Sequence, residues 1–241
     1  MKLFCSQLRQ ELTVMARNGE QLLLLVFIPV LLLVFFSRTD FLPISEQDNI
    51  DFLMPGVLAL AIMSTAMVSL GIATGFERGY GVLRRLGTTP LGTGRLVAAK
   101  VSAVLVIELT QFAILIGVGL WLDWRPTEMS LPVILATMVL GSAAFAGIGL
   151  ILAGRLRAEV NLAAQNGLYL VLLLLGGILL PTEELPNGLK DFADLLPSTL
   201  LGDLLRDSFA GENAATNNLA ILAVWAVATC GLAALCFRWS D

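Results

Sequence analysis

Apolar runs about as long as a lipid bilayer is thick recur along this 241-residue chain. A helix needs ~20 predominantly apolar residues to cross the hydrocarbon core. The runs that come near this length lie at about 20–37, 52–75, 96–121, 131–153, 161–180 and 217–237. Hydrophobic residues make up 57% of the chain and charged residues 14%, unlike a soluble domain. We therefore predict an all-α, polytopic membrane protein with six transmembrane helices in a single domain, residues 1–241.

Two other interpretations of these runs fit the residue order less well. A transmembrane barrel needs short strands of alternating polarity, and the run 168–175 does not alternate. The first run contains Pro29 and continues into Ser37 and Arg38 instead of a small-residue cleavage site. We therefore expect a retained first span and not a signal peptide.

The basic residues predict the orientation, because Lys and Arg are enriched in short cytoplasmic loops. With the N-terminus in the cytoplasm, only four of the 15 basic residues lie outside: Arg38, Arg125, Lys190 and Arg206. We expect both termini and the loop 76–95 in the cytoplasm, and the segment 181–216 outside. The formal net charge of −4 then describes the outer face and does not indicate a nucleic-acid partner.

Residues 1–18 are too polar to span a membrane and have an amphipathic pattern. The apolar stripe consists of Phe4, Leu8, Leu12 and Met15, and the opposite face carries Lys2, Arg9 and Arg17. Glu11 interrupts the pattern, because it lies near the apolar edge. This pattern is typical of a helix in the headgroup plane, in contact with membrane lipids. Such a helix serves either as an anchor only or also as a brace for a cytoplasmic partner.

The sequence lacks the residues that most enzyme sites need. It contains no histidine and no lysine in a Walker A frame, so it has neither the commonest general base nor a phosphate-binding loop. The paired acids, Glu183 with Glu184 and Asp203 with Asp207, are expected to solvate outer loops. Cys230 and Cys236 are about 9 Å apart along one helix, too far for a disulfide. We predict a non-enzyme that binds no metal and no cofactor itself.

The segment 76–95 has the parts of a short cytoplasmic helix. Val82, Leu83 and Leu86 cluster on one side, and Pro90 prevents the helix from continuing. Composition alone leaves two functions open. The arginines fix the topology while the leucines rest on the membrane, or the segment is an amphipathic knob for a partner.

The residue order FERGYGVLRRLGTTPL in this segment resembles the loop after the second span in type-two ATP-binding-cassette (ABC) exporter permeases, including the daunorubicin-exporter-like branch. The matching residues are Glu77-Arg78, Gly81, Leu83-Arg84-Arg85-Leu86 and Thr89-Pro90-Leu91. The resemblance extends over the whole chain, from the amphipathic start to the segment PSTLLGDLLR at 197–206 before the last span.

This resemblance implies a coupling helix that docks on a separate cytoplasmic ATPase, which would hold the ATP and Mg²⁺. It implies two permease copies, as a homodimer or heterodimer, in a prokaryotic inner membrane, exporting a drug, lipid or lipid-linked saccharide. Leu83 and Leu86 would be anchors in the ATPase groove, with Arg84 and Arg85 at its rim. Glu77 would pair with one of these arginines or with the partner.

Several polar residues fall inside the predicted spans. Glu108 and Gln111 lie in the third span, where a charge is costly, and Asn161, Gln165 and Asn166 open the fifth. Glu108 would contact substrate, form a structural hydrogen bond across a dimer, be neutral and bonded within the bundle, or carry protons. The last option makes the chain a proton-coupled secondary carrier, our alternative function. The three amides either line the cytoplasmic entry to a pathway or form the hydrated end of a helix.

Small residues in the second and fourth spans indicate close helix packing. They are Gly71, Gly75, Gly141, Ala144 and Gly147. Within 181–216, two short amphipathic pieces are too short to cross the membrane. We predict that they form a short outer helical hairpin over the pathway exit, as in similar permeases.

Overall fold

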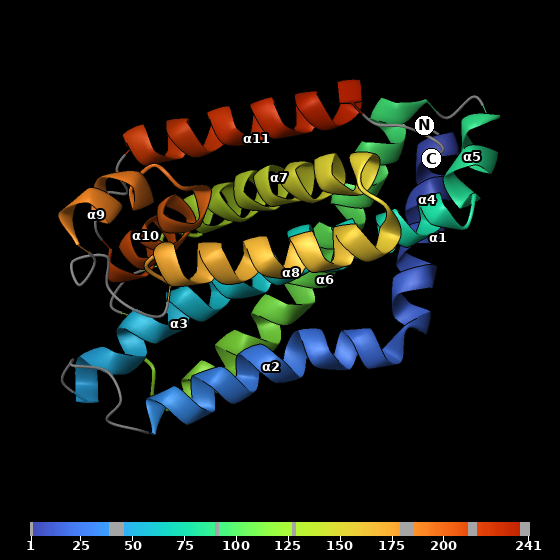
Figure 1. Cartoon of the computed structure of the whole chain (residues 1–241). Coiled ribbons are helices and arrows are strands. Elements are labelled where there is room, and N and C mark those ends of the chain that lie inside the picture. Colours follow the sequence, from blue (N-terminus) through green and yellow to red (C-terminus); the bar gives the residue numbers. More distant parts are fainter. Residues whose placement is uncertain are drawn as a thin grey trace.

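The computed structural model describes residues 2–38, 46–89, 92–126, 129–178, 186–211 and 216–236. Every regular element in these ranges is a helix (Figure 1). Six helical stretches are long and apolar enough to span a membrane, which confirms the predicted fold class. They are Gly19–Ser37, Ile50–Gly79, Gly94–Trp121, Leu131–Arg155, Ala158–Leu175 and Thr216–Cys236.

The first four spans and the segments beside them form eight elements. These are α1 (Lys2–Arg17), α2 (Gly19–Ser37), α3 (Glu46–Ile62), the π-helix η1 (Met63–Ser69), α4 (Leu70–Gly79), α5 (Val82–Gly87), α6 (Thr93–Trp121) and α7 (Leu131–Arg155), the last being the fourth span. The remaining elements are α8 (Ala158–Leu175), α9 (Asn187–Ala193), α10 (Pro197–Ala210) and α11 (Thr216–Cys236).

The second span is one continuous helical rod built from α3, η1 and α4. It continues through Gly79, beyond the apolar run 52–75 on which the prediction rested. The extra turn carries Glu77 and Arg78, and both side chains have partners inside the protein. A helix can therefore extend past its apolar run when its charged residues are satisfied internally.

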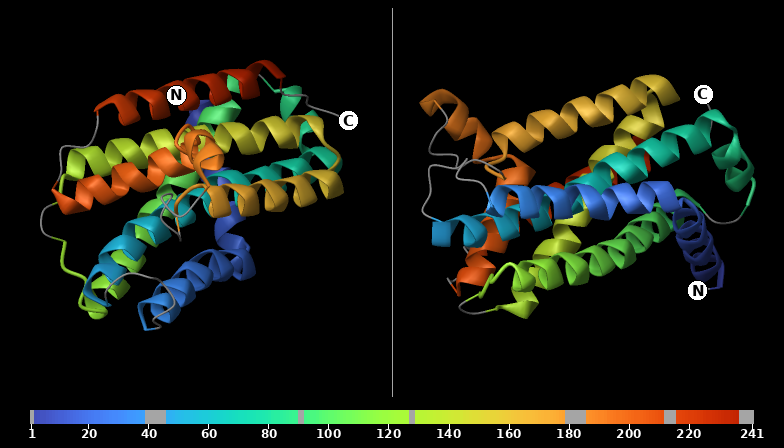
Figure 2. Two further views of the ribbon diagram at one scale, coloured as in Figure 1. Left: turned by 60° about the vertical axis from the view of Figure 1, so that its left-hand side comes forward. Right: turned by 90° about the horizontal axis from the view of Figure 1, so that it is seen from below.

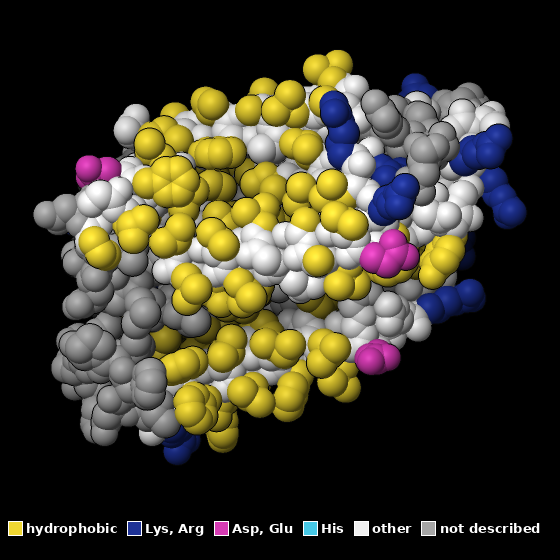
Figure 3. Space-filling model, in the orientation of Figure 1, with side chains coloured by type: hydrophobic (Ala, Val, Ile, Leu, Met, Phe, Trp, Pro, Cys, Tyr) yellow, Lys and Arg dark blue, Asp and Glu magenta, His cyan; other side chains and the backbone are white. Residues whose placement is uncertain are grey.

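This second span is also the centre of the molecule. Of its most apolar window, 78% is buried, against 11% for α2 and 17% for α8. The helices α2, α6, α7, α8 and α10 all pack against parts of it. A helix that is apolar on all sides belongs in such a core position. The peripheral helices expose apolar side chains over the flank of the molecule, where lipid would lie (Figure 3).

The two ends of the bundle differ in charge. The helices α1 and α5 and the α7–α8 turn gather at one end, and α9 and α10 lie at the other (Figures 1 and 2). Lys and Arg side chains cluster at the α5 end (Figure 3), which we call the basic end. Its exposed arginines are Arg9, Arg17, Arg84, Arg85, Arg95, Arg155 and Arg157.

Candidate functional site

A buried lysine joins three helices at the basic end. Lys100, near the start of α6, is 1% exposed. Its Nζ lies 3.0 Å from Glu11 Oε2 of α1 and 2.8 Å from Glu77 Oε2 of α4. Gln7 adds a bond on the α1 side, since its Nε2 donates to Glu11 Oε1 at 2.7 Å. The amphipathic helix and the last turn of the second span are thus fixed to the same ammonium group.

Arg78 ties the same turn to a different part of the bundle. Its guanidinium is buried, and Nη2 donates to the backbone carbonyl of Leu156 at 2.7 Å. Leu156 follows α7 in an extended conformation and begins the turn into α8. Both charged residues of the Glu77–Arg78 pair therefore face inward, toward α1, α6 and the α7–α8 turn.

The short helix α5 follows this pair after a sharp turn at Gly81. Gly81 has a φ of +72°, a left-handed conformation that glycine adopts without steric cost. At the other end of α5, the Thr88 and Thr89 hydroxyls donate to the carbonyls of Arg85 and Leu86. The predicted coupling residue Pro90 lies outside the described residues.

The exposed face of α5 differs from the face expected from the sequence. Arg84 and Arg85 are exposed and Leu86 is half-buried, but Leu83 is fully buried in the protein's own core. The hypothesis that Leu83 anchors in a partner's groove is therefore wrong for this conformation, because its surface is already covered by the bundle. Leu83 instead holds α5 onto the spans.

The partner expected for Glu77 also needs correction. The sequence suggested Arg84, Arg85 or a second protein, whereas Glu77 is bonded to Lys100. Sequence reasoning missed Lys100 and Glu11 as site residues. Two signals pointed to them: a lysine in the first turns of an apolar span, and an acid at the apolar edge of an otherwise regular amphipathic stripe.

Glu108 is fully buried and bonded to the next helix. Ser142 Oγ of α7 lies within hydrogen-bond distance of both Glu108 Oε2 and the Met138 carbonyl. The Ser142 hydroxyl donates to the Glu108 carboxyl and thereby joins α7 to α6. Ser142 belongs to the same chain, so the geometry matches the option of a Glu108 bonded within the bundle.

Two of the three amides in α8 bind other helices. Asn161 Nδ2 donates to the Gly71 carbonyl and Gln165 Nε2 to the Gly149 carbonyl, each at 2.9 Å. Gln165 also donates to Asn161 Oδ1 at 3.2 Å. A Cβ at Gly71 would collide with Gln165 and one at Gly75 with Asn161, so these glycines make room for the amides. Both amides are buried contacts and not the exposed lining of a pathway.

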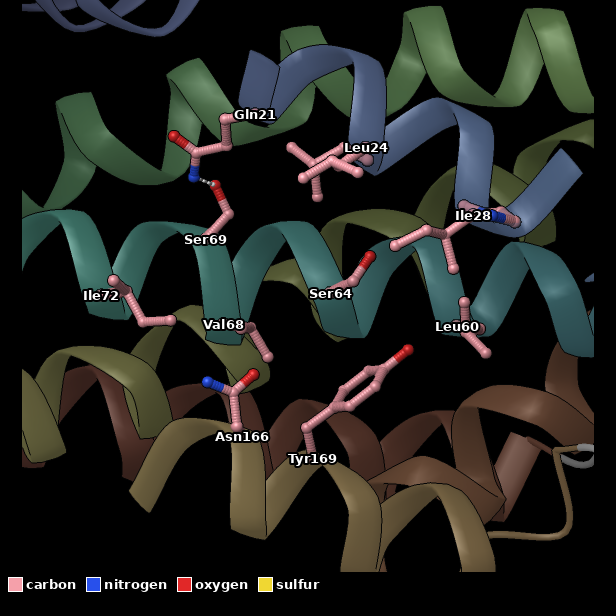
Figure 4. A pocket seen from close by; sticks show the side chains of 12 residues that line it. Gln21, Leu24, Ile28, Leu60, Ser64, Val68, Ser69, Ile72, Asn166 and Tyr169 are labelled. Carbon is pink, nitrogen blue, oxygen red and sulfur yellow. Dashed lines mark hydrogen bonds between the residues drawn. The ribbon is translucent and has the colours of Figure 1, made fainter. Parts of the chain in front are cut away.

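Asn166 has a different environment, since it lines a pocket between α2, the second span and α8 (Figure 4). The pocket has a volume of about 310 Å³ and walls that are mostly aliphatic, such as Leu24, Ile28 and Leu60. Its polar lining comes from Gln21, Ser64, Ser69, Asn166 and Tyr169. Gln21 Nε2 donates to Ser69 Oγ at 2.6 Å across one end of the pocket (Figure 4).

Gln111 is not part of the lining of this pocket. It is 1% exposed, and its amide bonds to the Leu25 carbonyl of α2 and to Thr65 of η1. The five predicted intramembrane residues therefore have separate locations. Glu108 contacts α7, Gln111 contacts α2 and η1, Asn161 and Gln165 contact α4 and α7, and only Asn166 faces the pocket.

Comparisons with known proteins agree with this architecture. A family model described as "ABC-2 type transporter" matches residues 2–210. The chain is 22% identical over 211 residues to "Putative transport permease YvfS" of Bacillus subtilis strain 168, covering 86% of this chain and 85% of that protein. It is 29% identical over 161 residues to "ABC transporter G family member 20" of Dictyostelium discoideum. That match covers 66% of this chain but only 22% of the Dictyostelium protein.

Proposed function

Because the chain belongs to the ABC-2 type transporter family, we propose that this membrane permease is the translocating subunit of an ATP-driven exporter. In this proposal a separate cytoplasmic ATPase docks on the basic end and carries the ATP and Mg²⁺. A second permease copy completes the pathway. The sequence is consistent with this division of labour, because it has no Walker A frame of its own.

The observation that carries the proposal is the attachment of α5 to the second span. The exposed residues Arg84 and Arg85 offer a positive surface at the basic end, while Leu83 fixes the same helix to the core. Directly before α5, Glu77 and Arg78 bond to Lys100 and to the Leu156 carbonyl. A force applied to α5 would therefore reach the central helix of the bundle.

The pocket between α2, the second span and α8 is the proposed substrate surface. Aliphatic walls with a few polar groups suit an amphipathic molecule such as a drug, a lipid or a lipid-linked saccharide. The pocket is bordered by the same span whose end carries the docking loop. ATP-driven movement of α5 would then change the pocket through a single helix.

The alternative of a proton-coupled carrier has less support. Glu108 is fully buried, is bonded to Ser142 and is not part of the pocket lining. A proton-coupling carboxyl needs alternating access to water, whereas this one occupies a helix contact between α6 and α7.

The docking surface can be tested by charge reversal. The permease is co-expressed with its ATPase and reconstituted in vesicles, and ATP hydrolysis is measured in the Arg84→Glu, Arg85→Glu double variant. We expect about a tenfold lower apparent affinity for the ATPase, equivalent to about 1.4 kcal/mol, without loss of the folded permease.

The matched control is Arg125→Glu, an exposed arginine in the α6–α7 connection, outside the basic end, which should leave ATPase binding unchanged. Wild-type ATPase binding in the double variant would contradict the proposed docking surface. Transport that runs on a pH gradient without any ATPase, and that is lost in Glu108→Gln, would instead favour the proton-coupled carrier.

A further inference from the structure

Pro29 leaves a carbonyl in the first span without its usual donor. In an α-helix the N–H of each residue bonds to the carbonyl four residues earlier, and proline has no N–H. The carbonyl four residues before Pro29 is that of Leu25, in the interior of α2. Water cannot substitute in the hydrocarbon region, so a transmembrane helix needs another group to satisfy this carbonyl.

Gln111 of α6 provides the missing donor. Its Nε2 donates to the Leu25 carbonyl at 2.9 Å. The other end of the same amide is also used, because Gln111 Oε1 accepts a hydrogen bond from Thr65 Oγ1 at 2.8 Å. Thr65 is fully buried in the π-helix η1. The Gln111 amide thus links the Leu25 carbonyl of α2, which Pro29 leaves without a donor, to Thr65 in the π-helix of the second span.

The two helices that Gln111 connects form two of the walls of the pocket. Leu24, Leu25, Ile28 and Pro29 come from α2, and the second span contributes residues on either side of Thr65, including Ser64. In Figure 4 the second span runs between α2 and α8, and the labelled side chains come from all three. The relative position of these two helices determines the width of the pocket, and Gln111 is hydrogen-bonded to both of them.

We propose that Gln111 is a positioning residue: by satisfying the Leu25 carbonyl at the proline of α2, it fixes the course of α2 beside η1 and thereby sets the shape of the pocket. The relevance of this shape to substrate choice rests on the proposed function, but the positioning itself does not. The role requires a donor directed at the Leu25 carbonyl. Leucine offers none, so Gln111→Leu leaves that carbonyl unsatisfied and also removes the acceptor of the Thr65 hydroxyl.

A second substitution, at Pro29, should compensate for the loss of Gln111. Pro29→Ala returns an N–H to position 29, which can bond to the Leu25 carbonyl within the helix. If Gln111 acts by satisfying that carbonyl, Pro29→Ala will rescue Gln111→Leu. A residue that merely fills space between α6 and α2 would not be rescued by a backbone N–H elsewhere.

The test measures the position of α2 directly, in the permease alone in lipid nanodiscs. Cys5, Cys230 and Cys236 are replaced by Ser, and spin labels are attached at Leu23→Cys of α2 and Leu170→Cys of α8. These positions are 61% and 55% exposed. The labelled permease is diluted with an excess of unlabelled permease, so that pulsed electron paramagnetic resonance gives the distribution of distances between the two labels of one copy, across the pocket.

We expect one narrow distribution for the wild-type background and for the matched control Thr110→Val. Thr110 is the exposed neighbour of Gln111, and its hydroxyl bonds only to the Val106 carbonyl of its own helix among the bonds described. Gln111→Leu should shift or broaden the distribution. Adding Pro29→Ala should return it to a single narrow peak.

An unchanged distribution in Gln111→Leu, or no recovery in the double variant, would overturn the proposal. If Gln111→Leu does not fold, the double variant is expected to fold, and its failure would also overturn the proposal. No ATPase is present, so failure of the proposed ATP coupling leaves this measurement unaffected. A permease that couples to an ATPase normally but shows no effect of Gln111 would disprove only this inference.

Discussion

Lys100 is the residue whose partners most clearly link separate parts of the protein. Its two carboxylate bonds reach α1 and α4, helices that are far apart in the sequence. A buried ion pair adds little net stability compared with an apolar contact, but removing one member of it is costly. The main effect of this cluster is therefore to hold α1, α4 and α6 in fixed relative positions at the basic end.

Replacing Lys100 with Met tests this role at the residue scale. The substitution leaves Glu11 and Glu77 close together without a cation, and we expect the free energy of unfolding to fall by about 3 kcal/mol. Because α1 loses its tie to α6, trypsin should also cleave faster after Arg17. Both effects are measured in nanodiscs, by thermal unfolding and by the rate of proteolysis.

Adding Glu11→Gln and Glu77→Gln to Lys100→Met should recover much of the loss, because the uncompensated charges are removed. Lys190→Met, which changes a lysine of α9, serves as the control and should leave both measurements unchanged. Equal stability and equal cleavage in Lys100→Met would show that the cluster does not fix α1.

At the scale of helices, the contact between α4 and α8 combines two glycines with two amides. The amides reach backbone carbonyls because Gly71 and Gly75 have no side chains in the way. Small residues of this kind let membrane helices approach closely, and polar side chains then bond across the interface. Gly71 and Gly75, which were predicted as helix-packing sites, therefore leave room for the side-chain amides of Gln165 and Asn161.

We predict that Gly75→Ala destabilises the protein by about 1–3 kcal/mol, because the new methyl group collides with Asn161. Gly117→Ala is the matched control on α6, since a Cβ there has no atom within 4 Å. The control should be neutral or more stable by less than about 1 kcal/mol. Thermal unfolding in nanodiscs measures both, and equal effects of the two variants would contradict this account.

The sequence predicts these helices well because each span leaves a direct signal in length and apolar content. It did not predict η1, since a π-helix depends on one locally accommodated residue and leaves the apolar run unchanged. The candidate site also contains a feature that the sequence could not predict. Periodicity placed Leu83 on an apolar face of its helix, but it could not indicate whether this bundle or a partner covers that face.

Partners far apart in the sequence were also beyond prediction. Glu77 and Lys100 are 23 residues apart, and Arg78 and Leu156 are 78 apart. Only packing of the helices brings them together. Two exceptions to regular patterns were the informative positions: Glu11 on its apolar edge binds Lys100, and Pro29 in its span leaves the Leu25 carbonyl to Gln111.

For the whole molecule, the uneven distribution of basic residues predicts the orientation in the membrane. Cys5 is exposed on α1 at the basic end, so it reports the side on which that end lies. With Cys230 and Cys236 replaced by Ser, a membrane-impermeant maleimide should label Cys5 only after cells are permeabilised. Labelling of intact cells would place the basic end outside and exclude docking of a cytoplasmic ATPase there.

The difference in burial between the central span and the helices α2 and α8 has a consequence for how such a permease can evolve. One wall of the pocket belongs to the helix against which α2, α6, α7, α8 and α10 pack, so a substitution there disturbs several helix contacts at once. The other two walls belong to helices that mostly face lipid. If the pocket binds cargo as proposed above, selection can change the preference for cargo through α2 and α8 while the central helix stays the same.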